Sequence, residues 1–378
     1  MKMGVYVDDN TATGPDEHEL RHEVSLILKE FPGKIIEPEH QPNGDLLYDQ
    51  LGADVHYNPN KYKVRICMQS YIRTKLAPKF GMVGCKKVDN PCFTESALYD
   101  TASPEVKFPL REAVGALQWC VTICRPDIAQ PVNCLAKVAS KPCTKAIVAC
   151  VKKVLRYVIH TEDVGIDYSP ENEQKFKQVY GSLLQKGEKL KDWNLFTDAS
   201  FASCFVTLKS TSGALLYYRG APIVWKTARQ SVRTHSTFEA EFVAGSDGLI
   251  MSETCTFKGF LEDRDASEDL WMDNQTAITV AKTPGDAQRP RSRHVALRYH
   301  KVADECEKIK FCPTEHMKAD CLTKNNVPRD VRDHVFHHNP HMTNKRKVKV
   351  SEDPEEVDAC FTVVGVPGLF FSLEDLWA

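Results

Sequence analysis

The clearest hydrophobic pattern of the chain begins near residue 193. A short apolar run, Trp193 to Phe196, leads directly to a polar pair that contains Asp198. Two further strand-like runs lie at 213–216 and 223–225, and Arg219-Gly220 separates them like a tight turn. Short apolar runs bounded by turn residues are typical of buried strands. The pattern therefore predicts three consecutive strands from residue 193 onward.

Helical and strand patterns alternate after these strands. Residues 236–259 predict one long helix, because Ser236-Thr-Phe-Glu239 has the spacing of a capping box. Residues 270–272 predict a short buried strand. Three further helices are expected at residues 276–282, 292–307 and 314–324.

The first half of the chain shows a different order of elements. Val5 and Val7 alternate with polar neighbours and predict a strand that turns at Asp8-Asp9, an acidic pair that by itself is most simply a hairpin turn. The pattern then predicts an amphipathic helix at residues 16–31 and paired strands at 44–68. An irregular stretch at 80–107 and three helices within 109–160 are expected to follow. Residues 169–192 are polar and are expected to be a linker.

Composition narrows the class of protein only slightly. The chain has 378 residues, 42% of them apolar, and a net charge of −2, so bulk charge gives no sign of nucleic-acid binding. No run is long and apolar enough for a membrane span and no signal peptide is evident, so a cytoplasmic or nuclear protein is expected. The fourteen cysteines are scattered, and reduced core thiols are expected at Cys120, Cys124, Cys134 and Cys150.

Four acidic residues stand in distinctive surroundings. Asp198 and Asp273 follow apolar runs, Glu241 lies in the predicted long helix before Phe242, and Asp320 lies in the last predicted helix, 314–324. A solvated surface carboxylate is the simplest reading of any one of them. Together they suit Mg²⁺, which prefers oxygen ligands, and two-metal hydrolysis of a phosphodiester requires such a carboxylate set.

Two local cationic segments could contact phosphates. Residues 136–160 contain six Lys or Arg and no acid, including Lys152, Lys153 and Arg156. The second segment has its cations at Arg291, Arg293, His294, Arg298 and His300. A solvated face is the alternative for both segments, and one of the histidines could also assist product release.

Seven ordered sequence blocks of residues 193–324 resemble the RNase H domain of copia-type retrotransposon Pol polyproteins. The blocks are Thr-Asp-Ala-Ser (197–200), Ser-Thr-Ser-Gly (210–213), Gly-Ala-Pro-Ile-Val-Trp-Lys (220–226), Ser-Thr-Phe-Glu-Ala-Glu-Phe (236–242), Asp-Asn-Gln-Thr-Ala-Ile (273–278), Arg-His-Val-Ala-Leu-Arg-Tyr-His (293–300) and Pro-Thr-Glu-His-Met-Lys-Ala-Asp-Cys-Leu-Thr-Lys (313–324). The resemblance implies an α/β fold, α+β overall, with an RNase H-like mixed five-stranded sheet and flanking helices. It also implies an endonuclease that cleaves the RNA strand of RNA–DNA hybrids with two Mg²⁺ ions, or Mn²⁺ in their place.

The same resemblance assigns the metal ligands residue by residue. They would be Asp198, Glu241, Asp273 and Asp320, with Glu239 acting at the helix start and Glu241 as the catalytic glutamate. Family members usually have Asp where this chain has Ala296. That departure favours the alternative of a catalytically inactive or co-opted remnant that binds nucleic acid.

The N-terminal half resembles the end of a copia-type reverse transcriptase. Tyr6-Val-Asp-Asp9 matches the polymerase motif, whose paired carboxylates, here Asp8 and Asp9, would bind metal, and Arg125-Pro-Asp-Ile-Ala129 matches a downstream block. The upstream part with the third palm aspartate is absent from these residues, so primer extension by this chain alone is not expected. The missing N-terminal reverse transcriptase portion would then be a partner.

The resemblance also suggests a division of the chain. Residues 1–168 would be a truncated palm and thumb remnant, 169–192 the linker, and 193–325 the RNase H-like domain. No motif gives a role to residues 326–378, which include a basic run at 345–349.

Overall fold

The computed structural model describes residues 2–6, 9–261, 267–283, 293–325, 327 and 329–338. It opens with a hairpin of β1 (Lys2–Tyr6) and β2 (Asp9–Thr13), as the alternating pattern predicts. Helix α1 (Glu17–Glu30) follows, and Asp16 caps it by accepting a hydrogen bond from the Glu19 N–H at 2.7 Å. None of its residues is buried, so the apolar stripe that predicted the helix is only partly covered.

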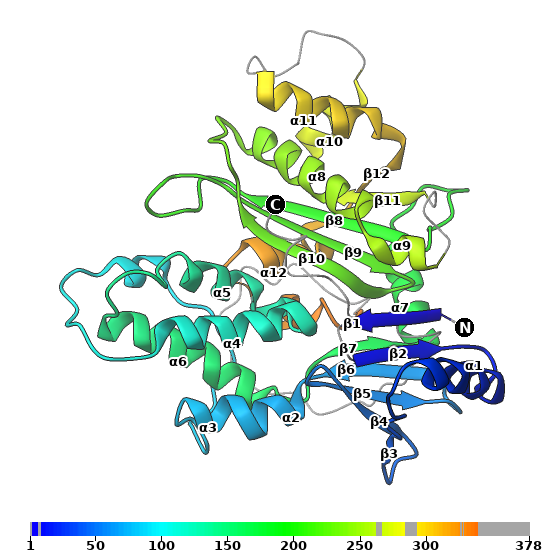
Figure 1. The fold of residues 1–378 in the computed structure, drawn as a ribbon. Coiled ribbons are helices and arrows are strands. Elements are labelled where there is room, and N and C mark those ends of the chain that lie inside the picture. The colour runs from blue at the N-terminus through cyan, green and yellow to red at the C-terminus, as the bar shows by residue number, and fades with distance from the viewer. Residues whose placement is uncertain are drawn as a thin grey trace.

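The N-terminal half contains an antiparallel sheet in the order β3-β4-β5-β6-β7. Its strands are β3 (Glu39–His40), β4 (Leu46–Gln50), β5 (Ala53–Asn58), β6 (Lys63–Cys67) and β7 (Ile166–Tyr168). Three of them lie in the region 44–68 where paired strands were predicted. The last, β7, joins only after about one hundred residues, because the chain first builds a helical layer (Figure 1).

This helical layer carries the predicted three helices. The main ones are α4 (Leu110–Ile123), α5 (Ala129–Ala136) and α6 (Lys145–His160), preceded by the short turns α2 (Gln69–Tyr71) and α3 (Ala77–Lys79). Between α4 and α5, Arg125 and Asp127 form a fully buried ion pair with a 2.8 Å contact. Tyr157 of α6 donates a hydrogen bond to the same carboxylate at 2.9 Å, which ties α6 to this turn.

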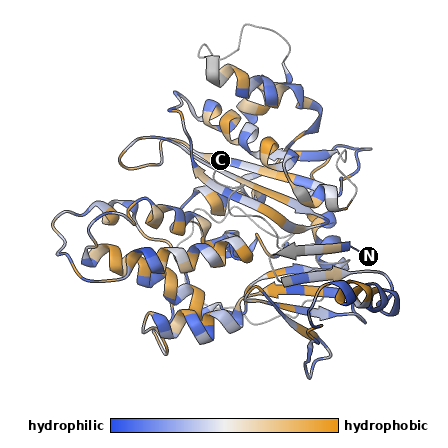
Figure 2. Ribbon diagram, viewed as in Figure 1, coloured by the Kyte–Doolittle hydropathy of each residue, from blue (hydrophilic) through white to orange (hydrophobic). Residues whose placement is uncertain are grey.

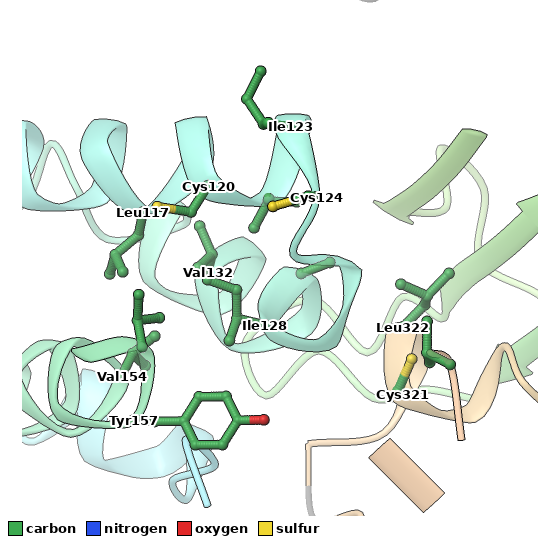
Figure 3. Packing of buried hydrophobic residues seen from close by; sticks show 14 of the residues in the cluster. Leu117, Cys120, Ile123, Cys124, Ile128, Val132, Val154, Tyr157, Cys321 and Leu322 are labelled. Atoms are coloured by element: carbon green, nitrogen blue, oxygen red, sulfur yellow. The ribbon is translucent and has the colours of Figure 1, made fainter. Parts of the chain in front are cut away.

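The cysteines of the helical layer behave as small apolar side chains. Cys120 and Cys124 lie among aliphatic residues of α4 and α5, and Cys321 of a distant segment lies across from them (Figure 3). All cysteines in the described part of the chain are free thiols. Burial raises the pKa of Cys120 to about 12, so this thiol stays protonated. The expectation of reduced core thiols is confirmed at the four positions named, which are all buried.

Residues 169–192 differ from the linker that their polarity predicted. Much of this stretch is helix α7 (Pro170–Gly181), which starts at Ser169 and buries Phe176, Val179 and Tyr180. The few apolar residues contact the core of the molecule, and the polar Asn172 is also buried, where its side chain donates to the Asp167 and Gly220 carbonyls. A low apolar content therefore hid a short amphipathic helix.

The second sheet lies in the C-terminal half and has the strand order β10-β9-β8-β11-β12. Its strands are β8 (Trp193–Ser200), β9 (Thr211–Tyr218), β10 (Ala221–Arg229), β11 (Glu268–Met272) and β12 (Ile309–Phe311). The first three pair antiparallel, whereas β11 runs parallel to both β8 and β12. This confirms the expected mixed five-stranded sheet, although three-residue β12 had no signal of its own.

The helices of this half correct two sequence predictions. The expected long helix over 236–259 is two helices, α8 (Thr237–Glu253) and α9 (Thr256–Phe260), because the chain bends at Thr254-Cys255. The expected helix over 314–324 is a 3₁₀ turn followed by the four-residue α12 (Asp320–Thr323). The other helices are α10 (Gln275–Lys282), α11 (Arg293–Asp304) and α13 (Arg329–Asp333). The helix that contains Asp320 is therefore not the last one.

Both faces of the second sheet are buried, because neighbouring residues along each strand enter different cores. Leu195, Leu216 and Leu270 pack with residues of α8 and α11. Phe196 and Trp271 enter the larger core, which continues into α4–α6 and α7. Hydrophobic residues accordingly run along these strands and helices (Figure 2). The sheet is thus fixed from both sides, which holds the ends of its strands in place.

Within the described residues, the structure contains no helix that is both long and apolar enough to span a membrane.

Candidate metal centre

Asp198 lies near the end of β8, at the edge where α12 crosses the sheet. Its register partner on β9 is Gly213. A Cβ atom at Gly213 would lie 2.6 Å from the Thr323 Cγ2 and 2.8 Å from the Leu322 Cβ. Only a residue without a side chain allows α12 to approach β9 this closely. This glycine therefore fixes the place of α12 beside Asp198.

Three carboxylates from distant parts of the chain meet at this edge. Asp273 follows the last residue of β11, which runs parallel to β8, and Asp320 is the first residue of α12. One carboxylate oxygen from each of Asp198, Asp273 and Asp320 lies within 4.8 Å of the others. Asp198 and Asp320 are almost fully buried, whereas Asp273 is partly exposed, so the cluster opens to solvent on one side.

Glu241 approaches the same cluster from α8. Its carboxylate is buried and accepts a hydrogen bond from the Ala199 backbone, next to Asp198. The Oε2 atom accepts no hydrogen bond from the described residues. Burial and the nearby charges of Asp198 and Asp273 hold the pKa of Glu241 well above its usual value. A buried acceptor without a donor, facing other carboxylates, is stable only as an acid or with a cation.

Glu239 has a different position at the start of α8. Ser236 caps the helix through the Glu239 N–H at 3.3 Å, and the Glu239 carboxylate accepts from the His235 N–H at 2.7 Å. The capping box predicted from the sequence is therefore present in a modified form. The backbone N–H that donates to Glu239 belongs to His235, the residue before the cap Ser236, and not to Ser236 itself. Farther along α8, a Cβ at Gly248 would lie 2.6 Å from the Thr197 Cγ2, so a glycine here brings α8 close to β8.

A lysine side chain lies inside the cluster. The Lys324 ammonium is 3.3 Å from the Asp198 Oδ1 and also forms an ion pair with Asp320. Burial raises the pKa of Asp320 to about 7, with the charge of Asp198 as the next cause. Burial would lower the pKa of Lys324, but Asp198 and Asp320 outweigh it and raise that pKa. The ammonium thus partly balances a concentration of negative charge.

Two threonines orient the carboxylates. The Thr323 hydroxyl donates to the Asp198 Oδ2, and the Thr314 hydroxyl donates to the Asp273 Oδ2 at 3.3 Å. Hydrogen bonds of this kind hold metal-binding carboxylates in position. Sequence reasoning gave no role to Thr323, Lys324 or Thr314. The only signal was their place in the block 313–324, next to Asp320.

These residues fit a divalent cation. The centre offers carboxylate oxygens within 4.8 Å, an acceptor on Glu241 without a donor, and an opening beside Asp273. Hard cations such as Mg²⁺ take oxygen ligands at about 2.0–2.1 Å, so two oxygens bound to one ion lie at most about 4.2 Å apart and the carboxylates would move closer together on binding. An ammonium in the same place shows that the site already accommodates positive charge.

The other residues singled out from the sequence have mixed positions. Arg298 is paired with Asp247 at 2.6 Å, and His300 is partly exposed beside Tyr299 on α11. Lys152, Lys153 and Arg156 are partly exposed on α6. Arg291 and Asp8 lie outside the described residues, as do the side chains of Arg293, His294 and Asp9. Their assigned roles in binding nucleic acid or metal stay predictions.

Comparisons with solved structures give limited overlap. The foamy viral protease-reverse transcriptase in complex with RNA/DNA hybrid aligns with 94% of this chain and 38% of its own, at a TM-score of 0.43 and 12% identity. LC11-RNase H1 aligns with 35% of this chain and 94% of its own, at a TM-score of 0.27 and 16% identity. Overlaps of this size carry no weight for fold or function, and the fold rests on the strand order described above.

Comparisons of sequence are more informative. No family model matches the chain. The retrovirus-related Pol polyprotein from transposon TNT 1-94 of Nicotiana tabacum is 27% identical over 341 residues, which are 86% of this chain and 23% of that protein. The Pol polyprotein from transposon RE2 of Arabidopsis thaliana is 27% identical over 330 residues, or 85% of this chain and 20% of that protein. The chain thus spans about a fifth of the length of these relatives, and along 85% or more of its own length it is similar to retrovirus-related Pol polyproteins from transposons.

Proposed function

We propose that residues 193–325 form a divalent-metal nuclease of the RNase H type, which hydrolyses the RNA strand of RNA–DNA hybrids. The observation that carries this proposal is the meeting of Asp198, Asp273 and Asp320 within 4.8 Å, with the unpaired Oε2 of Glu241 beside them. Four acids from separate segments have no structural reason to share one buried place, because like charges repel. A cation of charge two removes that cost.

The carboxylates would hold Mg²⁺ or Mn²⁺, with Asp198 and Asp320 as the buried ligands and Asp273 at the open side. When bound, such ions activate water and stabilise the leaving oxygen of a phosphodiester. Thr323 and Thr314 keep Asp198 and Asp273 in the orientation that binding requires. Glu241 presents its free oxygen from the α8 side, so the substrate phosphate would enter past Asp273, where the cluster is exposed.

Lys324 has to move when a divalent ion is bound. Its ammonium lies 3.3 Å from the Asp198 Oδ1, in a place that a cation between Asp198 and Asp320 would share. Two positive charges so close repel by several kcal/mol even at an effective dielectric constant of about 20. The side chain is about one third exposed, so it can swing toward solvent, where it would meet the phosphates of a bound substrate.

The test is cleavage of a hybrid whose RNA strand carries an end label. The full chain with Mg²⁺ is expected to shorten the RNA, and EDTA is expected to stop the reaction. Asp198→Asn keeps the size of the side chain and removes its charge, and its amide offers one acceptor oxygen where the carboxylate offers two. This variant should lose activity by at least about 10²–10³-fold, the usual result of removing one electrostatic element of an active site.

Matched substrates separate this proposal from general nuclease activity. The same RNA paired with RNA, and the same sequence as a DNA duplex, should remain intact under identical conditions. Equal cleavage of all three duplexes, or full activity of Asp198→Asn, would show that the carboxylate centre is not an RNase H site.

A second candidate function is nucleic-acid binding without catalysis. It is favoured by Lys324, since an ammonium bound between Asp198 and Asp320 partly satisfies the cluster without any metal. This function would be supported if the chain binds the hybrid, if neither Mg²⁺ nor Mn²⁺ gives cleavage, and if calorimetry detects no divalent ion bound to it.

A further inference from the structure

The connection between β8 and β9 exposes an unusual number of apolar side chains. Phe205, Val206 and Leu208 are 59%, 59% and 63% exposed, and Phe201 is 40% exposed. In Figure 1 this connection extends from the sheet to the same side of the molecule as helices α4–α6. It starts three residues after Asp198, so whatever binds it would lie close to the candidate metal centre.

This connection has a defined shape. The Cys204 N–H donates to the Lys209 carbonyl at 3.0 Å, and the Leu208 N–H donates back to the Cys204 carbonyl at 2.9 Å. Ala202 and Leu208 have φ values of 48° and 52°, a left-handed conformation that costs a residue with a side chain about 1–2 kcal/mol. Such conformations persist where surrounding contacts enforce them, and they gather at binding sites. The apolar side chains are therefore presented by a fixed turn.

Phe205 stacks on an aromatic ring of the N-terminal half. Its ring lies 5.6 Å from that of Tyr99, with 20° between the ring planes. The Lys141 ammonium lies 4.5 Å from the centre of the Tyr99 ring. Since Phe205 remains 59% exposed after this contact, part of its ring is open to solvent. We call Tyr99, Phe205 and Lys141 the stacking surface.

The charges around the stacking surface are of both signs. Tyr99 itself lies in a segment with Glu95, Asp100 and Glu105, whereas the two segments beside it are basic. Two segments of the chain contain no Asp or Glu, although the whole chain has 51. Residues 199–238 carry five Lys or Arg, and residues 128–161 carry six. The two segments adjoin, because the Asn133 side chain donates to the Thr227 carbonyl at 3.2 Å. Arg229 lies close enough for its positive charge to interact with the Tyr99 hydroxyl. The nearby acid Glu95 is already paired with Lys137 at 3.1 Å. The cations of these two basic segments can therefore hold the phosphates of a polyanion.

We infer that the stacking surface binds an unpaired nucleotide base of a strand that continues beyond the hybrid. This inference rests on the proposed function and adds to it a preference for substrates with a single-stranded overhang. An exposed aromatic ring can stack only on a base that is not already stacked in a duplex, and flanking cations hold the adjoining phosphates. Phe205 follows Asp198 by seven positions, so the base lies within about 25 Å of the metal centre, or about seven nucleotides along a strand.

The test measures binding in a chain that carries Asp198→Asn, so that cleavage does not interfere. The ligands are a fluorescein-labelled blunt hybrid and the same hybrid with an overhang of about eight nucleotides, as RNA in one arm and as DNA in another. Fluorescence anisotropy should show the overhang substrates bound more tightly. Phe205→Ala should weaken their binding about tenfold, as for the loss of one base–aromatic stack, and should change blunt binding less than twofold.

Two further variants control this test. Phe205→Trp should retain overhang binding, because its ring also stacks. Val206→Ala removes an equally exposed apolar side chain from the same turn and should leave binding of every ligand unchanged. Equal losses for Phe205→Ala and Val206→Ala, or for blunt and overhang ligands, would overturn the inference and indicate an apolar contact with another surface or with a protein.

Failure of the inference is distinguishable from failure of the proposed function. If the native chain cleaves hybrids but Phe205→Ala binds overhangs normally, the nuclease proposal stands and the stacking surface does not. If Phe205-dependent overhang binding is present while hybrids remain uncleaved, the stacking surface stands and the nuclease proposal fails.

Discussion

Each of the two sheets of the molecule buries aspartates, but in opposite circumstances. Asp167 on β7 of the first sheet is buried nearly alone, with Arg65 at 4.0 Å and no hydrogen bond to its Oδ1 from the described residues. Burial raises the pKa of Asp167 to about 6. Burial raises the pKa of Asp320, beside the second sheet, to about 7, and the charges of Asp198 and Asp273 add to this effect.

The comparison shows that a raised pKa by itself does not mark a functional site. Asp167 and Asp320 are both costly to ionise, yet only Asp320 has neighbours that could share a cation. A divalent ion would remove the cost at Asp320 and leave that at Asp167 unchanged. Convergence of several acids, and not burial of one, distinguishes the candidate metal centre.

The largest expected effect is on hybrid cleavage. It should appear when a charge is removed beside the second sheet and not when one is removed in the N-terminal hairpin. Asp273→Asn should lower hybrid cleavage by about 10²–10³-fold, because it removes a ligand of the candidate metal centre. Asp9→Asn, in the acidic pair at residues 8 and 9, should retain cleavage within about twofold, since the proposed nuclease does not use it. Gel analysis of labelled RNA measures both variants, with circular dichroism to verify folding. Comparable losses in the two variants would remove the distinction between the two regions.

An intermediate effect, on the free energy of unfolding, is expected when Asp167 is replaced, and its size should depend on pH. The folded-state pKa of about 6 exceeds the unfolded value of about 4, so the stability associated with this group is present below pH 4 and is lost as the pH rises through 6. Asp167→Asn should therefore match the native chain near pH 4 and be more stable by about 2–3 kcal/mol at pH 8. Urea unfolding at both pH values measures the difference, with Mg²⁺ present and absent. A gain that appears only without Mg²⁺ would place Asp167 in the metal centre and refute the comparison.

The smallest effect concerns Lys324. Lys324→Met removes the ammonium that competes for the carboxylates, and Mg²⁺ or Mn²⁺ should then bind at least about tenfold more tightly. Titration calorimetry measures this affinity without any need for substrate. Lys301→Met breaks an exposed ion pair with Glu253 on the outer side of α8 and serves as the matched control, with no change expected. Weaker metal binding in Lys324→Met would mean that the lysine supports the centre instead of competing with it.

Much of the fold could be predicted from local pattern. The strands at 193–200, 211–218 and 221–229 have continuous apolar runs and turn residues between them, and helix α8 has its cap at Ser236. The errors occurred where local signal is weak. Helix α7 carries only a few apolar residues in a polar stretch, and β12 has three residues that become a strand only by pairing with β11.

The residues of the candidate site could be predicted from the sequence only in part. Motif similarity suggested all four acids, and the structure brings Asp198, Asp273 and Asp320 together with Glu241 beside them. The contacts of the supporting residues could not be predicted from the sequence. Thr323 and Lys324 were part of a quoted motif, but their hydrogen bonds to Asp198 link residues 125 and 126 positions apart, which no local pattern reveals.

The amino-acid sequence by itself determined most of the strands and helices, the reduced state of the four core cysteines, the family resemblance and the identity of the candidate acids. Burial and turn formation leave a periodic or compositional trace within a few residues, and that trace can be read directly. Only the tertiary structure decided that α12 crosses the sheet at Gly213, that Lys324 enters the acidic cluster, and that Phe205 stacks on Tyr99. These contacts depend on packing between segments distant in the chain, where the position of each segment is set by the whole core and not by its own residues.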